Sequence, residues 1–176
     1  MTINVGINGP GRIGKAVFRI IEDLRLNHNK DIQVTAINCP GTPSSNLKYF
    51  INYDSVHKLE KYDIEACETY LMVNKKMINL FREYDPCKIQ WDLAKVDYVI
   101  DATGVFRTID SASAHFVSKK VKKVIITAPS EDAPMYVVSV NTNNYDPSQK
   151  IVSNASCTTN CLAPIAKVIN DNFGIE

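Results

Sequence analysis

The sequence has 176 residues, of which 45% are hydrophobic, so it can bury the core of one ordinary domain. Its 20 Lys and Arg residues nearly balance its 19 Asp and Glu residues, which argues against a nucleic-acid or membrane partner. No apolar run is long enough to span a bilayer. The first residues form a predicted strand and do not show the basic and apolar regions of a signal peptide, so we expect a cytoplasmic protein. Five scattered cysteines without metal-ligand spacing predict reduced thiols and no metal site.

The first motif is a glycine loop between a strand and a helix. A β-rich run at 2–8 (TINVGIN) is followed at once by Gly9-Pro10-Gly11-Arg12-Ile13-Gly14, and apolar residues then recur at helical spacing over 13–24. In this context GxGxxG is typical of dinucleotide binding: Gly9 permits the turn, Gly11 admits a pyrophosphate and Gly14 allows close helix packing. Outside this context the glycines would indicate only a structural turn.

The second strand, predicted at 32–38 (IQVTAIN), ends without the expected acid. In such βαβ units an acidic residue at the carboxyl end of this strand binds the adenosine ribose. Cys39 occupies that position, whereas Asp31 precedes the strand and would lie at its wrong end. A thiol neither accepts paired ribose hydroxyl bonds nor repels a 2′-phosphate, so NAD and NADP both stay open as cofactors.

The remaining pattern alternates strands with helices. We predict a loop at 40–45, a hairpin (68–73 and 77–81) that decorates the sheet, strands at 98–101, 124–127, 136–140 and 151–153, and helices at 46–52 and 108–117. The expected fold is α/β, a Rossmann-type doubly wound, mainly parallel sheet.

Thr103 and Gly104 follow a strand at the edge where such sheets bind ligands. We interpret His57 as an ordinary histidine, Trp91 as a packing residue, and the lysines at 119–123 as a solvated helix end.

A second motif, Ser153-Asn154-Ala155-Ser156-Cys157-Thr158-Thr159-Asn160-Cys161, lies between a strand and an apolar-periodic helix at 162–173. Cys157 is therefore a thiol at a helix N-terminus, where unpaired N–H groups and the helix dipole stabilise the nucleophilic thiolate. The surrounding hydroxyl and amide groups are suited to hold a phosphate or an oxyanion. The alternative interpretation is a Ser-capped helix that carries a buried cysteine.

Together, GINGPGRIG, YDSVH, DATGVF, KKVIITAPSEDAPM and SNASCTTNC resemble the amino-terminal half of the phosphorylating glyceraldehyde-3-phosphate dehydrogenase family in their order and spacing. The resemblance implies a glycolytic and gluconeogenic oxidoreductase, a homotetramer, that oxidises glyceraldehyde 3-phosphate with NAD(P) through a thioester on Cys157 and uses inorganic phosphate. It implies phosphate binding by Ser156 and Thr158. It also implies that Arg12, Ile13, Thr103, Gly104 and Thr127 bind the cofactor. With Gly9, Gly11, Gly14 and Cys39 of the βαβ unit, these residues form the expected cofactor site.

The chain departs from the family pattern at four places. Pro10 replaces an aromatic residue, Cys39 replaces the ribose-binding aspartate, Tyr84 replaces an arginine, and the sequence stops at Glu176, before the family's catalytic histidine. We therefore predict a dinucleotide-binding domain at 1–153 and, at 154–176, the catalytic-cysteine helix that starts a substrate domain. These residues alone should bind a dinucleotide with little turnover. The alternatives are an erythrose-4-phosphate dehydrogenase and a non-catalytic dinucleotide-binding module.

Overall fold

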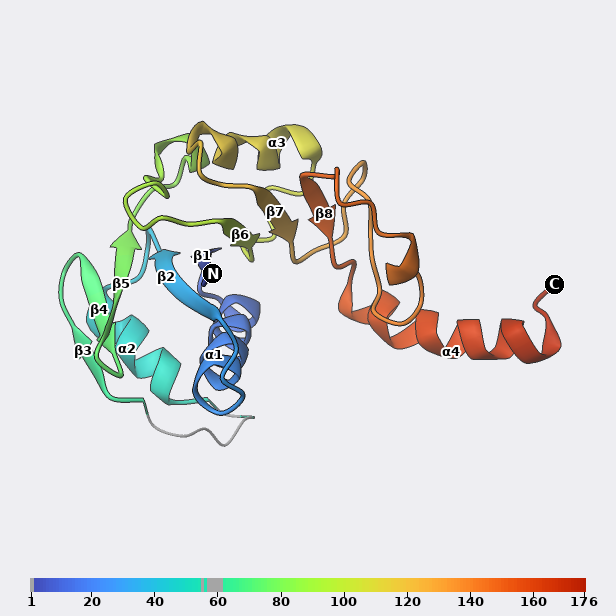
Figure 1. The fold of residues 1–176 in the computed structure, drawn as a ribbon, viewed down its shortest axis with the longest axis horizontal. Helices are drawn as coiled ribbons and strands as arrows, with labels where there is room; N and C mark the ends of the chain where they lie inside the picture. The colour runs from blue at the N-terminus through green and yellow to red at the C-terminus, as the bar shows by residue number, and fades with distance from the viewer. Residues whose placement is uncertain (1, 55, 57–61) are drawn as a thin grey trace.

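The computed structural model describes residues 2–54, 56 and 62–176 (Figure 1). Its centre is an eight-stranded sheet with the strand order β3-β4-β5-β2-β1-β6-β7-β8. The strands are β1 (Ile3–Asn8), β2 (Ile32–Asn38), β3 (Ile64–Ala66), β4 (Tyr70–Val73), β5 (Lys76–Phe81), β6 (Tyr98–Asp101), β7 (Lys123–Ile126) and β8 (Ile151–Ser153). All neighbours from β5 to β8 pair in parallel, so the predicted α/β, mainly parallel sheet is confirmed.

Helices cover both faces of the sheet (Figure 1). They are α1 (Arg12–Leu26), α2 (Ser44–Asn52), α3 (Ile109–Ser113) and α4 (Cys157–Phe173). On one face α1 and α2 bury Phe18, Leu47 and Ile51 against the sheet, and on the other face Trp91 lies in a second apolar cluster, as its predicted packing role requires. None of the described helices is long and apolar enough to cross a membrane.

The predicted hairpin forms, but its predicted role is wrong. Asn74 and Lys75 turn the chain between β4 and β5 with φ of 47° and 64°. However, β5 pairs in parallel with β2, and β3 adds a further antiparallel strand that the sequence pattern had not indicated. Leu71 is fully buried in the main apolar cluster. The hairpin is therefore an extension of the central sheet rather than a decoration.

The strand predicted at 136–140 is also wrong. Only Met135 forms a bridge to β8, through Ser153, and the chain then turns at Ser139 with φ of 65°. The Asn141 side chain accepts the Val137 N–H at 2.8 Å and donates to the Met135 carbonyl at 2.9 Å. Because this amide satisfies backbone groups that a neighbouring strand would otherwise bond, the apolar run forms a loop.

Two further segments differ in detail from the sequence pattern. The helix expected at 108–117 is α3, capped by Thr108, followed by a 3₁₀ turn at Ala114–Val117. Two of the lysines at 119–123 bond to neighbouring segments: Lys122 Nζ lies 2.8 Å from Asp97 Oδ1, and Lys123 Nζ donates to backbone carbonyls. His57 lies outside the described residues.

The burial of the hairpin can be tested by a core truncation. We expect Leu71→Ala to lower the free energy of unfolding by about 2–5 kcal/mol, the usual cost of removing a fully buried leucine. Met77→Ala, on the same hairpin but 54% exposed, is the matched control and should change stability by less than about 0.5 kcal/mol. Urea denaturation measures both; equal, small effects would mean that the hairpin is peripheral.

Candidate functional site

The carboxyl ends of the parallel strands define one edge of the sheet. The chain builds β1, β2 and β5 on one side, then returns to add β6, β7 and β8 on the other, so the order reverses between β1 and β6. Open α/β sheets bind ligands at such a point. A cleft of about 440 Å³ lies there. Its lining residues are Asn8, Gly9, Pro10, Gly11, Asn38, Cys39, Pro40, Gly41, Thr42, Glu83, Tyr84, Ala102, Thr103, Val105 and Phe106.

Two glycines of the loop after β1 have no room for a side chain. Gly9 has φ of +86°, and a Cβ there would lie 2.9 Å from Thr103 Cγ2. A Cβ on Gly14 would lie 2.2 Å from the Gly9 carbonyl oxygen. Gly11 caps α1 without a side-chain bond, and the first turn of α1 holds no acidic residue. This arrangement suits the approach of an anionic group to the helix N-terminus.

The structure brings some of the predicted cofactor residues together and leaves others apart. Gly9, Gly11, Cys39 and Thr103 line the cleft. Arg12 and Ile13 line a different hollow, between α1 and α2. Gly14, Gly104 and Thr127 are not among the lining residues of either hollow. Thr127 follows β7 at the same sheet edge, and its N–H donates to the Asp101 carbonyl at 2.9 Å.

Cys39 follows β2, as predicted, but its side chain packs into the apolar core. The residue is 2% exposed, and burial raises the pKa of its thiol. The Arg82 guanidinium donates to the carbonyls of Cys39 and Thr42, at 3.4 and 2.6 Å, and so secures the loop that follows. Of the residues that line the cleft, Glu83 is the one with a charged side chain.

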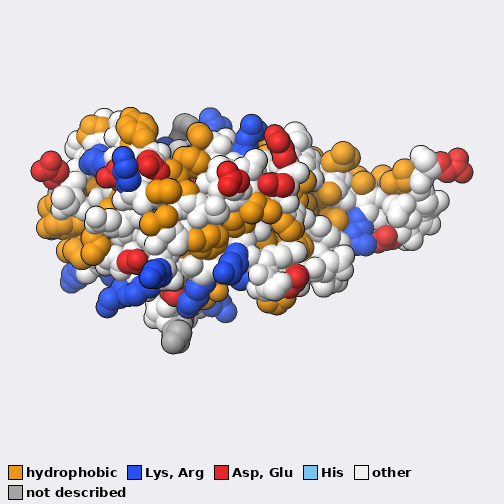
Figure 2. Space-filling view, turned by 90° about the horizontal axis from the view of Figure 1, so that it is seen from above, with side chains coloured by type: hydrophobic (Ala, Val, Ile, Leu, Met, Phe, Trp, Pro, Cys, Tyr) orange, Lys and Arg blue, Asp and Glu red, His pale blue; other side chains and the backbone are white. Residues whose placement is uncertain are grey.

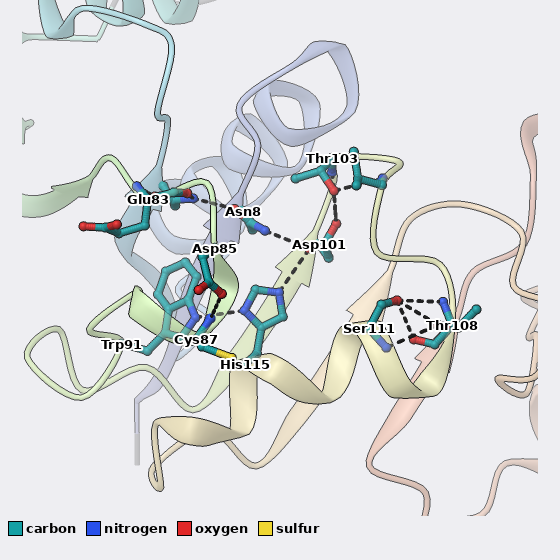
Figure 3. Close-up of polar contacts among 12 residues, drawn as sticks. Asn8, Glu83, Asp85, Cys87, Trp91, Asp101, Thr103, Thr108, Ser111 and His115 are labelled. Carbon is teal, nitrogen blue, oxygen red and sulfur yellow. Dashed lines mark hydrogen bonds and ion pairs between the residues drawn. The ribbon is translucent and has the colours of Figure 1, made fainter.

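A buried polar chain lies beneath the cleft, and the sequence reasoning missed it (Figure 3). It connects Asn38, Asn8, Asp101, His115 and Trp91 through side-chain hydrogen bonds of 2.8–3.1 Å. A signal was present in the sequence, because Asn8, Asn38 and Asp101 are each the last residue of a predicted strand. Polar residues at successive carboxyl ends of parallel strands must lie near one another at the same edge.

Cys157 is the first residue of α4, beside the end of β8. Its side chain is exposed, so the alternative of a buried cysteine is wrong. The preceding residue, Ser156, caps the helix by accepting the Thr159 N–H at 2.9 Å, and its Oγ also lies within 2.9 Å of Thr158 Oγ1. Within the described residues, no hydrogen bond occupies the backbone N–H of Cys157 or Thr158. The thiol therefore lies beside hydroxyl groups and two available amide donors.

The rest of α4 stands out from the body of the molecule (Figure 2). No residue of this helix is buried, and its apolar side chains are exposed. These are Leu162, Ile165, Val168, Ile169 and Phe173. The apolar spacing correctly predicted a helix, but the described part of the chain does not cover this face.

The described residues contain no cluster of side chains suited to a metal ion. All five cysteines are free.

Comparisons with known proteins add independent evidence. A family model described as the NAD binding domain of glyceraldehyde 3-phosphate dehydrogenase matches residues 3–109, and the C-terminal domain model of the same family matches residues 156–176. Relatives named glyceraldehyde-3-phosphate dehydrogenase come from Ogataea parapolymorpha (54% identity over 176 residues), Mucor circinelloides (52% over 175) and Debaryomyces hansenii (51% over 176). The alignments cover 99–100% of this chain but 50–51% of the relatives, so the chain spans about half their length. This chain therefore belongs to the glyceraldehyde-3-phosphate dehydrogenase family and carries that family's NAD-binding domain.

Proposed function

We propose that the protein acts as a phosphorylating glyceraldehyde-3-phosphate dehydrogenase. The observation that carries the proposal is the exposed Cys157 thiol at the first position of α4, on the sheet edge that also holds the dinucleotide cleft. We propose residues 1–153 as the dinucleotide-binding domain and residues 154–176 as the start of the substrate domain. Family membership supports extending the proposal to a cytoplasmic homotetramer.

In the proposed reaction, the Cys157 thiolate attacks the aldehyde carbon of glyceraldehyde 3-phosphate and forms a hemithioacetal. Loss of a hydride from that carbon, with loss of the hydroxyl proton, leaves a thioester. The bound nicotinamide supplies the hydride acceptor. Inorganic phosphate then attacks the thioester, which forms 1,3-bisphosphoglycerate and releases the thiolate. Sulfur serves both steps because a thiolate is a good nucleophile and an adequate leaving group.

The start of α4 offers groups for the phosphate step. The hydroxyls of Ser156 and Thr158 lie 2.9 Å apart, and the backbone N–H groups of Cys157 and Thr158 are available beside them. Donors at a helix N-terminus favour an anion through both hydrogen bonds and the helix dipole. We therefore assign phosphate binding to Ser156 and Thr158.

The cleft suits the pyrophosphate and adenosine parts of NAD. Gly9 and Gly14 let the loop pack closely, Gly11 has open space where a side chain would lie, and the first turn of α1 holds no acidic residue. Glu83 is the one charged residue that lines the cleft, whereas Cys39 is buried in the core. A 2′-phosphate would be repelled by that carboxylate, so we propose NAD as the preferred cofactor, with NADP accepted less well.

Activity tests the proposal directly. We expect purified protein to form NADH from glyceraldehyde 3-phosphate only when inorganic phosphate is present, and Cys157→Ser to abolish this activity because the thioester cannot form. The assay measures absorbance from NADH, with the intact mass of the protein checked beforehand. Faster turnover of erythrose 4-phosphate would replace the substrate assignment, and dinucleotide binding without turnover of either aldehyde in the whole protein would favour a non-catalytic module.

A polypeptide limited to residues 1–176, of 19.7 kDa, should bind NADH but turn over poorly, because a missing general base typically costs about 10²–10⁴-fold.

Thiol labelling tests the role of the helix N-terminus. We expect iodoacetamide to modify Cys157 about tenfold faster than Cys161, because only Cys157 lies where α4 presents unpaired N–H groups and its positive dipole end. Cys161 is a matched control, since it is exposed on the same helix. Cys39 should react last, because it is buried and burial raises the pKa of its thiol. Mass spectrometry of timed samples gives the rates; equal rates at Cys157 and Cys161 would contradict an activated thiol.

Cofactor preference tests the charge of the cleft. We expect Glu83→Gln to strengthen NADPH binding relative to NADH binding, so that the NADPH dissociation constant divided by the NADH dissociation constant falls about fivefold. The reason is that the Glu83 carboxylate would no longer repel the 2′-phosphate; two like charges about 4 Å apart repel by about 1 kcal/mol in water. Glu68→Gln removes an equal charge from the hollow on the other side of the 40–44 loop and should leave the ratio unchanged. Fluorescence titration measures both constants. An unchanged ratio in Glu83→Gln would show that Glu83 does not select the cofactor.

A further inference from the structure

The buried polar chain joins four neighbouring segments at the floor of the cleft (Figure 3). The Asn38 side chain at the end of β2 donates to Asn8 Oδ1 at 2.8 Å and accepts the Glu83 N–H at 2.9 Å. Asn8, at the end of β1, donates in turn to Asp101 Oδ2 at 2.8 Å. Asn8, Asn38 and Asp101 are each no more than 2% exposed. The chain therefore holds the carboxyl ends of β2, β1 and β6 and the segment after β5 in a fixed relation.

Asp101 is the acceptor on which the chain converges. Its Oδ1 accepts the Thr103 N–H at 3.1 Å and the Thr103 hydroxyl at 2.6 Å. Its Oδ2 lies 2.8 Å from Asn8 Nδ2 and 3.1 Å from His115 Nε2. An ionised carboxylate offers acceptor sites only, which matches four surrounding donors. The same carboxylate thus holds both the glycine loop, through Asn8, and the turn after β6, through Thr103.

The protonation state of His115 follows from its two partners. Its Nδ1 lies 3.1 Å from Trp91 Nε1, and an indole N–H can only donate. Nδ1 must therefore accept, so the ring proton lies on Nε2 and is donated to Asp101. His115 is fully buried, and its ring also packs edge-on against Phe106, which lines the cleft. Neutral His115 thereby completes the donor set of the carboxylate.

We propose that Asp101 and His115 are positioning residues for the dinucleotide, acting through Asn8 and Thr103. The glycine loop and the Thr103 turn both line the cleft, and they pack so closely that a Cβ on Gly9 would lie 2.9 Å from Thr103. A shift of the Asp101 carboxylate would change the spacing of both walls without changing any group that touches the ligand. The inference rests on the proposed dinucleotide binding.

Two conservative variants separate this role from simple packing. A glutamine at 115 can keep a donor to Asp101 but loses the acceptor for Trp91, whereas an asparagine can keep the acceptor but is too short to reach Asp101. We expect His115→Asn to weaken NADH binding about tenfold, the effect of losing one charge-assisted hydrogen bond, and His115→Gln to stay within about twofold. The indole N–H resonance of Trp91, the one tryptophan of the sequence, should move in His115→Gln more than in His115→Asn.

The experiment measures NADH affinity by fluorescence titration of the purified protein, with thermal unfolding as the test of folding. Val121→Ala, in the same apolar cluster but outside the polar chain, is the control for a general loss of packing and should leave NADH affinity unchanged. Equal weakening in both His115 variants, or weakening in neither, would overturn the positioning role. Failure of the unmodified protein to bind NADH would overturn the proposed function and this inference together.

Discussion

Burial of the Asp101 carboxylate is the constraint on which the ligand-binding edge depends. An ionised group removed from water costs several kcal/mol unless donors surround it. The donors come from Asn8, Thr103 and His115, and Asn8 is 93 positions away from Asp101 in the sequence. Satisfying one charge therefore requires β1, the turn after β6 and the 3₁₀ turn after α3 to meet in one arrangement. The end of β1 and the turn after β6 line the cleft.

Cys157, the proposed nucleophile, is held at the same edge by a different set of contacts. Ala155 is buried with φ of +62°, a conformation that costs a non-glycine residue about 1–3 kcal/mol. Its N–H donates to Ser153 Oγ at 2.9 Å, and that hydroxyl donates to the Ala128 carbonyl at 2.5 Å. These bonds offset the strain of a sharp turn between β8 and α4. The turn places Cys157 at the exposed start of the helix.

The Asn38 end of the buried polar chain also fixes the segment that lies beside Cys39. The backbone of Glu83 is bonded to both polar atoms of the Asn38 amide, at 2.8 and 2.9 Å, so Glu83 is held beside the end of β2. Glu83, on the segment after β5, therefore lines the cleft together with Cys39. Cys39 is then free to pack in the core, where the burial that raises the pKa of its thiol also removes it from contact with solvent.

Local pattern alone determined most of the architecture. Alternation of strands and helices, the glycine loop and the position of Cys157 before an apolar-periodic run were readable because they depend on neighbours in sequence. Tertiary structure decided the rest: that the hairpin joins β2, that the Asn141 amide turns residues 136–140 into a loop, and that Asn8, Asn38, Asp101 and His115 form one buried chain. The pairing of the hairpin and the buried chain depend on hydrogen bonds between residues far apart in sequence, whose partners exist only once the strands have been ordered in the sheet. The Asn141 bonds are local, to Met135 and Val137, but they form only in the folded loop.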